Sequence, residues 1–319
     1  MAQDIYATVT NRIIEELEKG VVPWRRPWNP DLCLGPDAPV NAVTGHYYSG
    51  INNLILGMHP ATFTTGDPRF CTYKQAQEKG WQIRKGEKAT PIVFYKPWEV
   101  DNEKYDPTKE DSPATRMIGL LRTFSVFHVG TQADGAPPYS PPTVEQAPWR
   151  RPEAVQTIVD SSGVVLRIGG DRAFYSTLGD FIQMPPDSAF ERGAQYFSAV
   201  LLHEMGHWSG AQHRLGRDLT GARGSAKYAT EEDIVDIAAA MSCGTLGLPV
   251  DYGNHASYAS HYLPALKEDK KLIFKIAAEA QKVSTFLLNF HPDYRRAHEP
   301  EASPQIPRPV ASLSHSPAA

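Results

Sequence analysis

Cysteine is scarce in this sequence, and its few copies follow no pattern of ligands or disulfides. Only three of the 319 residues are cysteines, Cys33, Cys71 and Cys243, and no two of them form a CxxC pair. An odd number of widely spaced cysteines argues against a disulfide framework and against a cysteine-ligated zinc site. The three are expected to be reduced thiols in the core of a cytoplasmic protein.

Long apolar runs and a strong charge bias are also absent. No stretch approaches the ~20 apolar residues that a membrane span needs, and the N-terminal residues lack the basic leader of a signal peptide. The sequence therefore predicts an intracellular protein without a membrane segment. A formal net charge of −4 excludes a chain that is basic throughout, although one face of one domain can still be basic.

The sequence does contain enough apolar residues for sizeable cores. Hydrophobic residues make up 41% of the chain, and its length suits one large domain or two ordinary ones. The proline-dense stretch 134–152 resists both helix and interior strand, so we expect a stiff linker there. We predict an α+β fold with two domains, 1–133 and 153–290. The Pro- and Ser-rich residues 291–319 are predicted to be a disordered tail.

Local patterns predict several elements. Apolar residues recur at helical spacing over residues 5–17, and a second helix is expected to begin with Thr230 as its N-cap. One long helix is expected from Ala265 to about Phe290. The stretch "DFIQMPP", residues 180–186, reads as a strand ahead of a helix, and we predict that it is an edge strand to which an extended substrate peptide pairs.

The stretch "HEMGHWSGAQH", residues 203–213, begins with the metal-binding motif HExxH. On a helix, His203 and His207 are one turn apart and point to the same side, so they can bind one ion, with Glu204 beside them. Two histidines and a third protein ligand leave one position for water, and Glu204 can take the proton of that water as it attacks a carbonyl. The expected ion is Zn²⁺, with another divalent metal as the alternative.

The third ligand has two candidates. His213 would complete the HExxHxxGxxH pattern of metzincins. Glu232 and Asp236 share one face of a downstream helix, so Glu232 can bind the metal while Asp236 accepts a hydrogen bond from a ligating histidine. Glu231 has no such carboxylate partner, because Val235 stands four residues after it. We favour Glu232, which gives a gluzincin-like zinc metallopeptidase site, and keep His213 as the alternative.

Cations and aromatic residues alternate in the N-terminal half. Binding of single-stranded DNA without sequence preference needs cations for the phosphates and aromatic faces for the bases. The candidate DNA-binding residues are Trp24, Arg25, Arg26, Trp28, Arg69, Tyr73, Lys74, Trp81, Arg84, Lys85 and Lys88. The alternative is that the tryptophans belong to the core and the lysines to a solvated face. Tyr47 and Tyr48 are a weaker candidate for base stacking.

These motifs together resemble the ArdC-type antirestriction proteins of conjugative plasmids and their phage-borne relatives. The likeness rests on "EKGVVPWRRPWN", "NAVTGHYYSGIN" and "RKGEKATPIVF" in the first half, and on "LLHEMGHWSG" and "YATEEDIVDIAAA" in the second. It implies an N-terminal domain that binds single-stranded DNA and a C-terminal zincin-like metallopeptidase domain. Two adjacent glutamates and a further carboxylate are typical of the family, and Glu231, Glu232 and Asp236 stand at these positions. The resemblance therefore supports Glu232 as the ligand and implies protection of incoming plasmid DNA from host restriction.

Three functions stay open on the sequence alone. The chain can be a DNA-protecting protein with a working peptidase, a DNA-binding protein with an idle metal site, or a metallopeptidase without a direct DNA role. The intact Glu204 argues against a decayed site, and three protein ligands argue against a purely structural zinc. The expected partners are single-stranded DNA and an unidentified protein substrate, for which a component of a host restriction system is one candidate.

Overall fold

The computed structural model describes residues 4–19, 22, 24, 38–102, 115–140, 153–190, 194–248 and 255–298. The N-terminal half contains α1 (Ile5–Glu18), β1 (Val40–Asn41), α2 (Ile51–Gly57), α3 (Pro60–Thr65), β2 (Arg69–Thr72), α4 (Tyr73–Glu78), β3 (Gln82–Ile83), β4 (Thr90–Asp101), β5 (Thr115–His128), α5 (Val129–Gln132) and β6 (Ala133–Asp134). The C-terminal half contains α6 (Ala154–Ser162), β7 (Val165–Ile168), β8 (Phe174–Ser176), β9 (Phe181–Met184), a 3-10 turn (Asp187–Ala189), α7 (Ala194–Ser209), α8 (Ala226–Leu246), α9 (His255–Glu268), α10 (Leu272–Leu288) and α11 (Pro292–His298). This mixed content confirms the predicted α+β class.

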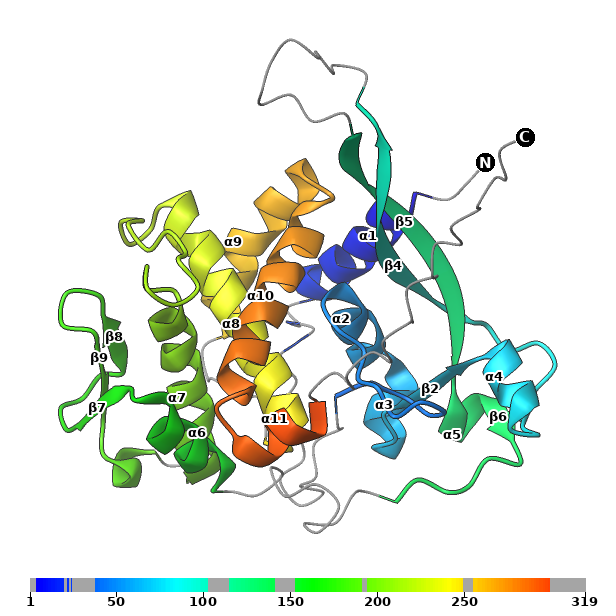
Figure 1. Cartoon of the computed structure of the whole chain (residues 1–319), viewed down its shortest axis with the longest axis horizontal. Coiled ribbons are helices and arrows are strands. Elements are labelled where there is room, and N and C mark those ends of the chain that lie inside the picture. Colours follow the sequence, from blue (N-terminus) through cyan, green and yellow to red (C-terminus); the bar gives the residue numbers. More distant parts are fainter. Residues whose placement is uncertain are drawn as a thin grey trace, which may run out of the picture.

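A long antiparallel ribbon dominates the N-terminal half. Its four-stranded sheet has the order β1-β2-β5-β4, and β4 and β5 pair from Thr90 opposite Val126 to Asp101 opposite Thr115. Figure 1 shows this pair as a twisted ribbon that rises away from the short helices around it. A separate two-stranded sheet joins β3 to β6 beside α4.

Three packed helices, α7, α8 and α10, form the centre of the C-terminal half. Beside α7 lies a three-stranded sheet with the order β7-β9-β8, in which β9 is parallel to β7 and antiparallel to β8. The predicted strand of residues 180–186 therefore exists as β9, but the prediction that it is a sheet edge is wrong. Strand neighbours occupy both of its sides, so a substrate peptide cannot pair with it.

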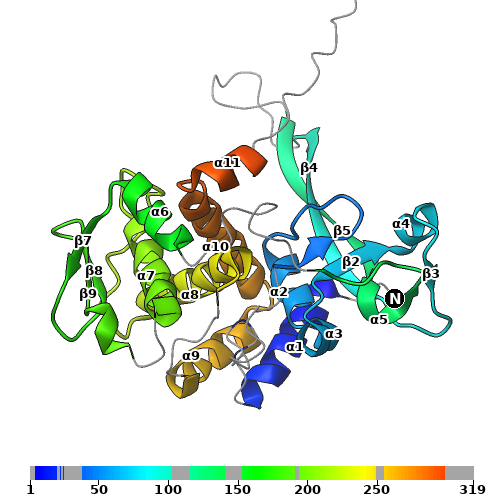
Figure 2. The ribbon, with the colours of Figure 1, turned by 90° about the horizontal axis from the view of Figure 1, so that it is seen from below.

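The two halves pack on a common hydrophobic core. One cluster of buried side chains includes Val9 and Ile13 of α1 together with Ile237 of α8 and Leu287 of α10. The Thr10 hydroxyl also donates a hydrogen bond of 2.7 Å to the carbonyl oxygen of Lys270, just ahead of α10. In both views α10 lies between α8 and α2 (Figures 1 and 2). The boundary between the halves is thus a packed interface.

Two predicted helix boundaries need correction. The N-cap of α8 is Ser225, whose hydroxyl accepts the N–H of Tyr228, while Thr230 lies inside the helix and bonds back to the Ala226 carbonyl. The long helix expected from residue 265 is interrupted where the Asp269 carboxylate accepts the N–H of Lys271, which separates α9 from α10.

The beginning of the tail also differs from the prediction. Residues 292–298 form α11, and Tyr294 of this helix is buried against the core. The rest of the predicted tail, from residue 299, lies outside the described residues. None of the helices in the described part of the chain combines the length and the hydrophobicity of a membrane span.

Candidate metal centre

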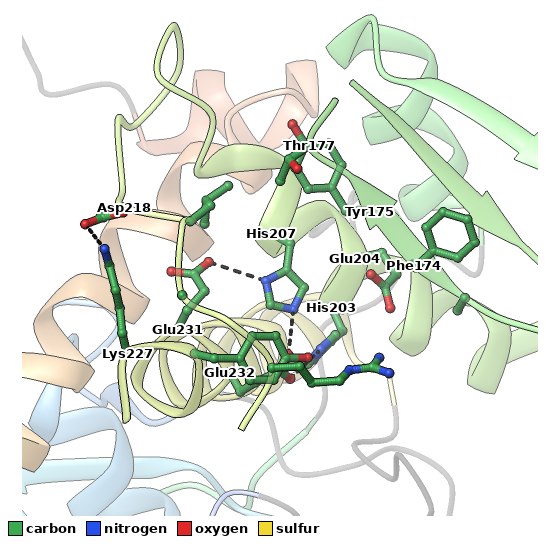
Figure 3. A pocket seen from close by; sticks show the side chains of 15 residues that line it. Phe174, Tyr175, Thr177, His203, Glu204, His207, Asp218, Lys227, Glu231 and Glu232 are labelled. Carbon is green, nitrogen blue, oxygen red and sulfur yellow. Dashed lines mark hydrogen bonds and ion pairs between the residues drawn. The ribbon is translucent and has the colours of Figure 1, made fainter. Parts of the chain in front are cut away.

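The HExxH residues lie on α7 where this helix packs against α8. Leu201, Leu202 and Met205 bury one side of α7 in the core, which directs His203 and His207 towards α8. Glu232 of α8 meets both imidazoles, with one carboxylate oxygen 3.5 Å from His203 Nε2 and the other 3.5 Å from His207 Nε2. One ligand atom from each of the three residues lies within 4.8 Å of the others (Figure 3). Two imidazole nitrogens and a carboxylate oxygen suit Zn²⁺ and other divalent transition metals.

A second carboxylate supports each histidine from its far side. Asp236 Oδ1 lies 3.8 Å from His203 Nδ1, near the ring as the sequence predicts but farther than a hydrogen bond, and its side chain has no exposed surface. Glu231 Oε1 lies 3.4 Å from His207 Nδ1. The sequence pattern predicts no role for Glu231. The indication that the sequence does offer is that Glu231 directly precedes Glu232. The two side chains project about 100° apart on α8, so both can reach a helix that crosses there.

Arg217 holds Glu231 in place. Its guanidinium donates to both carboxylate oxygens of Glu231, at 2.8 and 3.0 Å, and both side chains are about nine-tenths buried. The same guanidinium donates to the Gly206 carbonyl at 2.7 Å and to the Ser209 hydroxyl at 2.9 Å. Arg217 therefore fastens the end of α7 to the start of α8. No sequence motif predicts this residue.

Opposite charges stabilise each other in the centre. Burial lowers the pKa of His207, but its hydrogen bonds with Glu231 and Glu232 outweigh that effect and raise the pKa to about 10. Burial raises the pKa of Glu232, yet hydrogen bonds and charges from His203 and His207 hold it far below its usual range. A dense group of carboxylates around two imidazoles is an environment that favours a bound cation.

A cavity of about 400 Å³ opens over the three candidate ligands. Glu204 lines it and is itself buried, so its carboxylate lies beside the candidate metal position (Figure 3). Strand β8 borders the cavity through Phe174 and Tyr175. In the three-stranded sheet β8 has a strand neighbour on one side only. Among the described strands, the sheet edge next to the candidate metal centre is therefore β8.

Tyr228 also faces this cavity, one turn before Glu232 on α8, and is absent from the residues predicted from sequence. Burial and a hydrogen bond with Glu232 raise the pKa of its phenol to about 12, so the hydroxyl is a proton donor at neutral pH. Arg223 hydrogen-bonds the same hydroxyl.

His213 lies outside this cluster. Its side chain is 65% exposed, and its Nε2 lies 3.4 Å from Asp180 Oδ2 and 2.7 Å from a guanidinium nitrogen of Arg214. The cluster of possible ligands found among the described residues contains Glu232 and not His213. The geometry therefore favours the gluzincin-like arrangement.

The candidate DNA-binding residues in the described part of the chain do not form one surface. Trp24 is 7% exposed and packs edge-to-face on Tyr262 at 5.1 Å, so the prediction that its ring stacks on DNA bases is wrong. Arg69 is only 16% exposed and binds Asp67 through two hydrogen bonds. Trp81 packs partly buried against a small second core.

The exposed members of the set gather around α4 and the turn after β3. They are Tyr73, Lys74, Arg84, Lys85 and Lys88. Arg84 pairs with Asp134 at 2.8 Å, and Lys74 lies 3.8 Å from Glu78. Arg25, Arg26 and Trp28 lie outside the described residues.

Comparisons with known proteins cover both halves. Residues 3–127 match the family described as "N-terminal domain of anti-restriction factor ArdC", and residues 153–279 match the family described as "Zincin-like metallopeptidase". A zincin-like domain implies a metal ion. An uncharacterized Sinorhizobium fredii protein, y4eC, is 38% identical, with 89% of this chain and 91% of that protein aligned. Two Escherichia coli proteins named DNA primase TraC are 37% and 35% identical, but this chain spans only 27% and 20% of their lengths.

Two solved structures resemble the chain over nearly its full length. The metal-free crystal structure of the antirestriction ArdC protein from plasmid R388 has a TM-score of 0.72 and 34% identity, and covers 90% of this chain and 98% of that chain. The Mn(II)-bound structure of the same protein has a TM-score of 0.70 and 33% identity, and covers 91% and 98%.

Proposed function

The chain belongs to the ArdC family of antirestriction proteins, and on this premise we propose that it binds single-stranded DNA and protects incoming plasmid DNA from restriction with the help of a metal-dependent peptidase site. The observation that carries the peptidase part is the convergence of His203, His207 and Glu232 within 4.8 Å beside the buried Glu204. The exposed cations around α4 support the DNA-binding part.

His203, His207 and Glu232 would hold the metal ion, with Zn²⁺ as the proposed metal and Mn²⁺ as the alternative suggested by the related structure. The ion would polarise a peptide carbonyl and acidify a water molecule. Glu204 then accepts a proton from that water and passes it to the leaving amine. Asp236 and Glu231 face the Nδ1 atoms of His203 and His207, so a metal ion would take the place of the proton on each Nε2.

The protein substrate would bind along β8. Main-chain pairing with this strand places an extended peptide at the mouth of the cavity that Phe174 and Tyr175 border. Tyr228 also lines this cavity, and its hydrogen bond with Glu232 would hold that carboxylate in place for the metal. A component of the host restriction system is the proposed substrate.

Transfer of an unmodified plasmid into a restricting host tests this function. Cells that express the wild-type chain should protect the plasmid, and Glu204→Gln should protect it poorly while it keeps its metal and its DNA binding. A recipient without the restriction enzyme is the control. If Glu204→Gln protects the plasmid as well as the wild type does, the chain is better described as a DNA-binding protein with an idle metal site.

A further inference from the structure

A groove of about 790 Å³ lies where the two halves meet, away from the metal centre. Its walls come from α1, the loop before α2, the start of α2, β4 and β5 in the N-terminal half and from α10 in the C-terminal half. Five aromatic rings and a lysine stand out among its lining residues, namely Tyr6, Tyr47, Tyr48, Phe94, Phe274 and Lys271. The tyrosines of "HYYSGIN", which sequence alone offers as a weak stacking candidate, thus lie in one cavity with rings from distant segments.

Of these five rings, Phe94 is the exposed one, and the other four are partly buried. Phe94 is 56% exposed although it is a large hydrophobic residue, and Phe124 beside it is 45% exposed at a ring distance of 5.3 Å. Tyr47 lies roughly parallel to His298 of α11, with 5.8 Å between the ring centres. Binding pockets are typically concave and lined by hydrophobic and aromatic side chains.

The charged residues of the groove indicate what kind of ligand it can bind. The two charged residues among its described lining residues are Lys271 and Lys275, and none of those lining residues is acidic. Lys271 Nζ lies 5.2 Å from the centre of the Tyr6 ring, while Lys275 pairs with Asp269 at 3.0 Å. A ligand that suits such a groove is flat and aromatic on one part and anionic on another. An unpaired nucleotide has this chemistry.

We propose that this groove binds the unpaired bases of a single DNA strand, with Phe94 and Tyr47 as stacking surfaces and Lys271 as a phosphate contact. The inference rests on the proposed DNA-binding function and locates its base site. A duplex is excluded from the groove because its bases are already stacked and paired. The strand would touch α10, and α10 packs on α8, the helix that carries Glu232.

Fluorescence anisotropy of the full chain with a labelled oligothymidylate tests the inference. Phe94→Ala should weaken binding by about 10-fold or more, because a base that stacks on an aromatic ring loses that contact. Ile168→Ala is the matched control, since Ile168 on β7 is also 56% exposed and lies outside the groove. Thermal unfolding of both variants should match the wild type, because neither side chain belongs to the core.

An abasic strand of equal length separates stacking from charge. The wild type and Phe94→Ala should bind this strand equally, because the variant removes only a contact with bases. Lys271→Gln should weaken binding of both strands and flatten the salt dependence by about one phosphate contact.

The possible outcomes separate failure of the groove as the base site from failure of the proposed DNA binding. A wild-type chain that does not bind single strands would overturn both. Wild-type binding that Phe94→Ala leaves unchanged, but that Lys85→Ala and Lys88→Ala abolish, would move the site to the turn after β3 and overturn the groove alone. Unchanged DNA binding together with a dimer that Phe94→Ala dissociates would assign the groove to a second copy of this chain, which also overturns it.

Discussion

The indole N–H of Trp24 donates a hydrogen bond of 3.1 Å to Asp236 Oδ2, across 212 positions of the sequence. The other oxygen of this carboxylate faces His203 at 3.8 Å. A tryptophan of the N-terminal half therefore fixes the orientation of a group that supports the candidate metal ligand. Both side chains are buried, so the contact is shielded from water.

Trp24→Phe should lower metal affinity while the fold stays intact. The ring still packs on Tyr262, but Asp236 loses its donor and orients His203 less firmly. We expect an effect of about 10-fold, at the lower end of the range for residues behind a ligand. Competition of Zn²⁺ between the protein and a chelating dye measures it. Trp81→Phe, in the second core, is the control and should bind metal as the wild type does.

The third ligand can be identified by metal content after dialysis. Glu232→Ala should lose most of the bound metal, because two imidazoles alone remain. His213→Ala should stay loaded, since His213 is exposed beside Asp180. Asp236→Asn should fall between the two, with an affinity loss on the order of 10–100-fold. A metal-free His213→Ala with a loaded Glu232→Ala would establish the metzincin-like alternative.

Arg217→Ala should strongly destabilise the protein. It removes the guanidinium from the buried Glu231 carboxylate, which keeps only its longer contact with His207, and breaking a buried ion pair costs about 3–5 kcal/mol. Urea unfolding of the metal-free protein measures the change. Lys282→Ala removes an exposed pair with Glu279 and should change little, because such pairs contribute little to stability. Equal stability of the two variants would contradict a fastening role for Arg217.

Acid should destabilise the fold through His59. Burial, with the charges of His128 and Arg12, lowers the pKa of His59 to about 4. The unfolded chain, with a histidine pKa of about 6.5, therefore takes up a proton in the window between these values that the folded chain does not. This contribution to stability is present above about pH 6.5 and is lost as the pH falls towards 4.

His59→Asn isolates this contribution. The His59 ring accepts the N–H of Ala61 at the start of α3, and asparagine can replace it as an N-cap without titrating. The loss of unfolding free energy between about pH 7 and pH 5 should be smaller in the variant than in the wild type. An identical loss in both proteins would show that other groups cause the acid sensitivity.

Local rules predict the centre of the site, and tertiary contacts add the rest. His203, Glu204 and His207 follow from helical spacing, and Glu232 follows from its spacing to Asp236. The contacts of Glu231 and Arg217 depend on how α7 meets α8, which no spacing reveals. Trp24 fits a DNA-binding motif and a core position equally well until its partner Asp236 is known.

Which helix start forms, and whether a strand lies at an edge, likewise cannot be read from local sequence patterns. Ser225 and Thr230 are both good N-caps, and the cap that forms is the one that lets α8 begin earlier. The pattern of residues 180–186 predicts a strand, but an edge and a central strand differ only in their neighbours. Asp269 interrupts a continuous helical pattern because its side chain competes for a backbone N–H.

The bond between Thr10 and Lys270 joins positions 260 residues apart, and this separation has a consequence during synthesis on the ribosome. At about 5–20 residues per second, α1 waits roughly 13 to 50 s for the segment against which it packs. Through that interval Val9, Ile13 and Leu17 lack the C-terminal members of the buried cluster to which they belong. The first helix to be made is therefore among the last to be protected, and a nascent chain stalled before α9 would present it to chaperones and proteases.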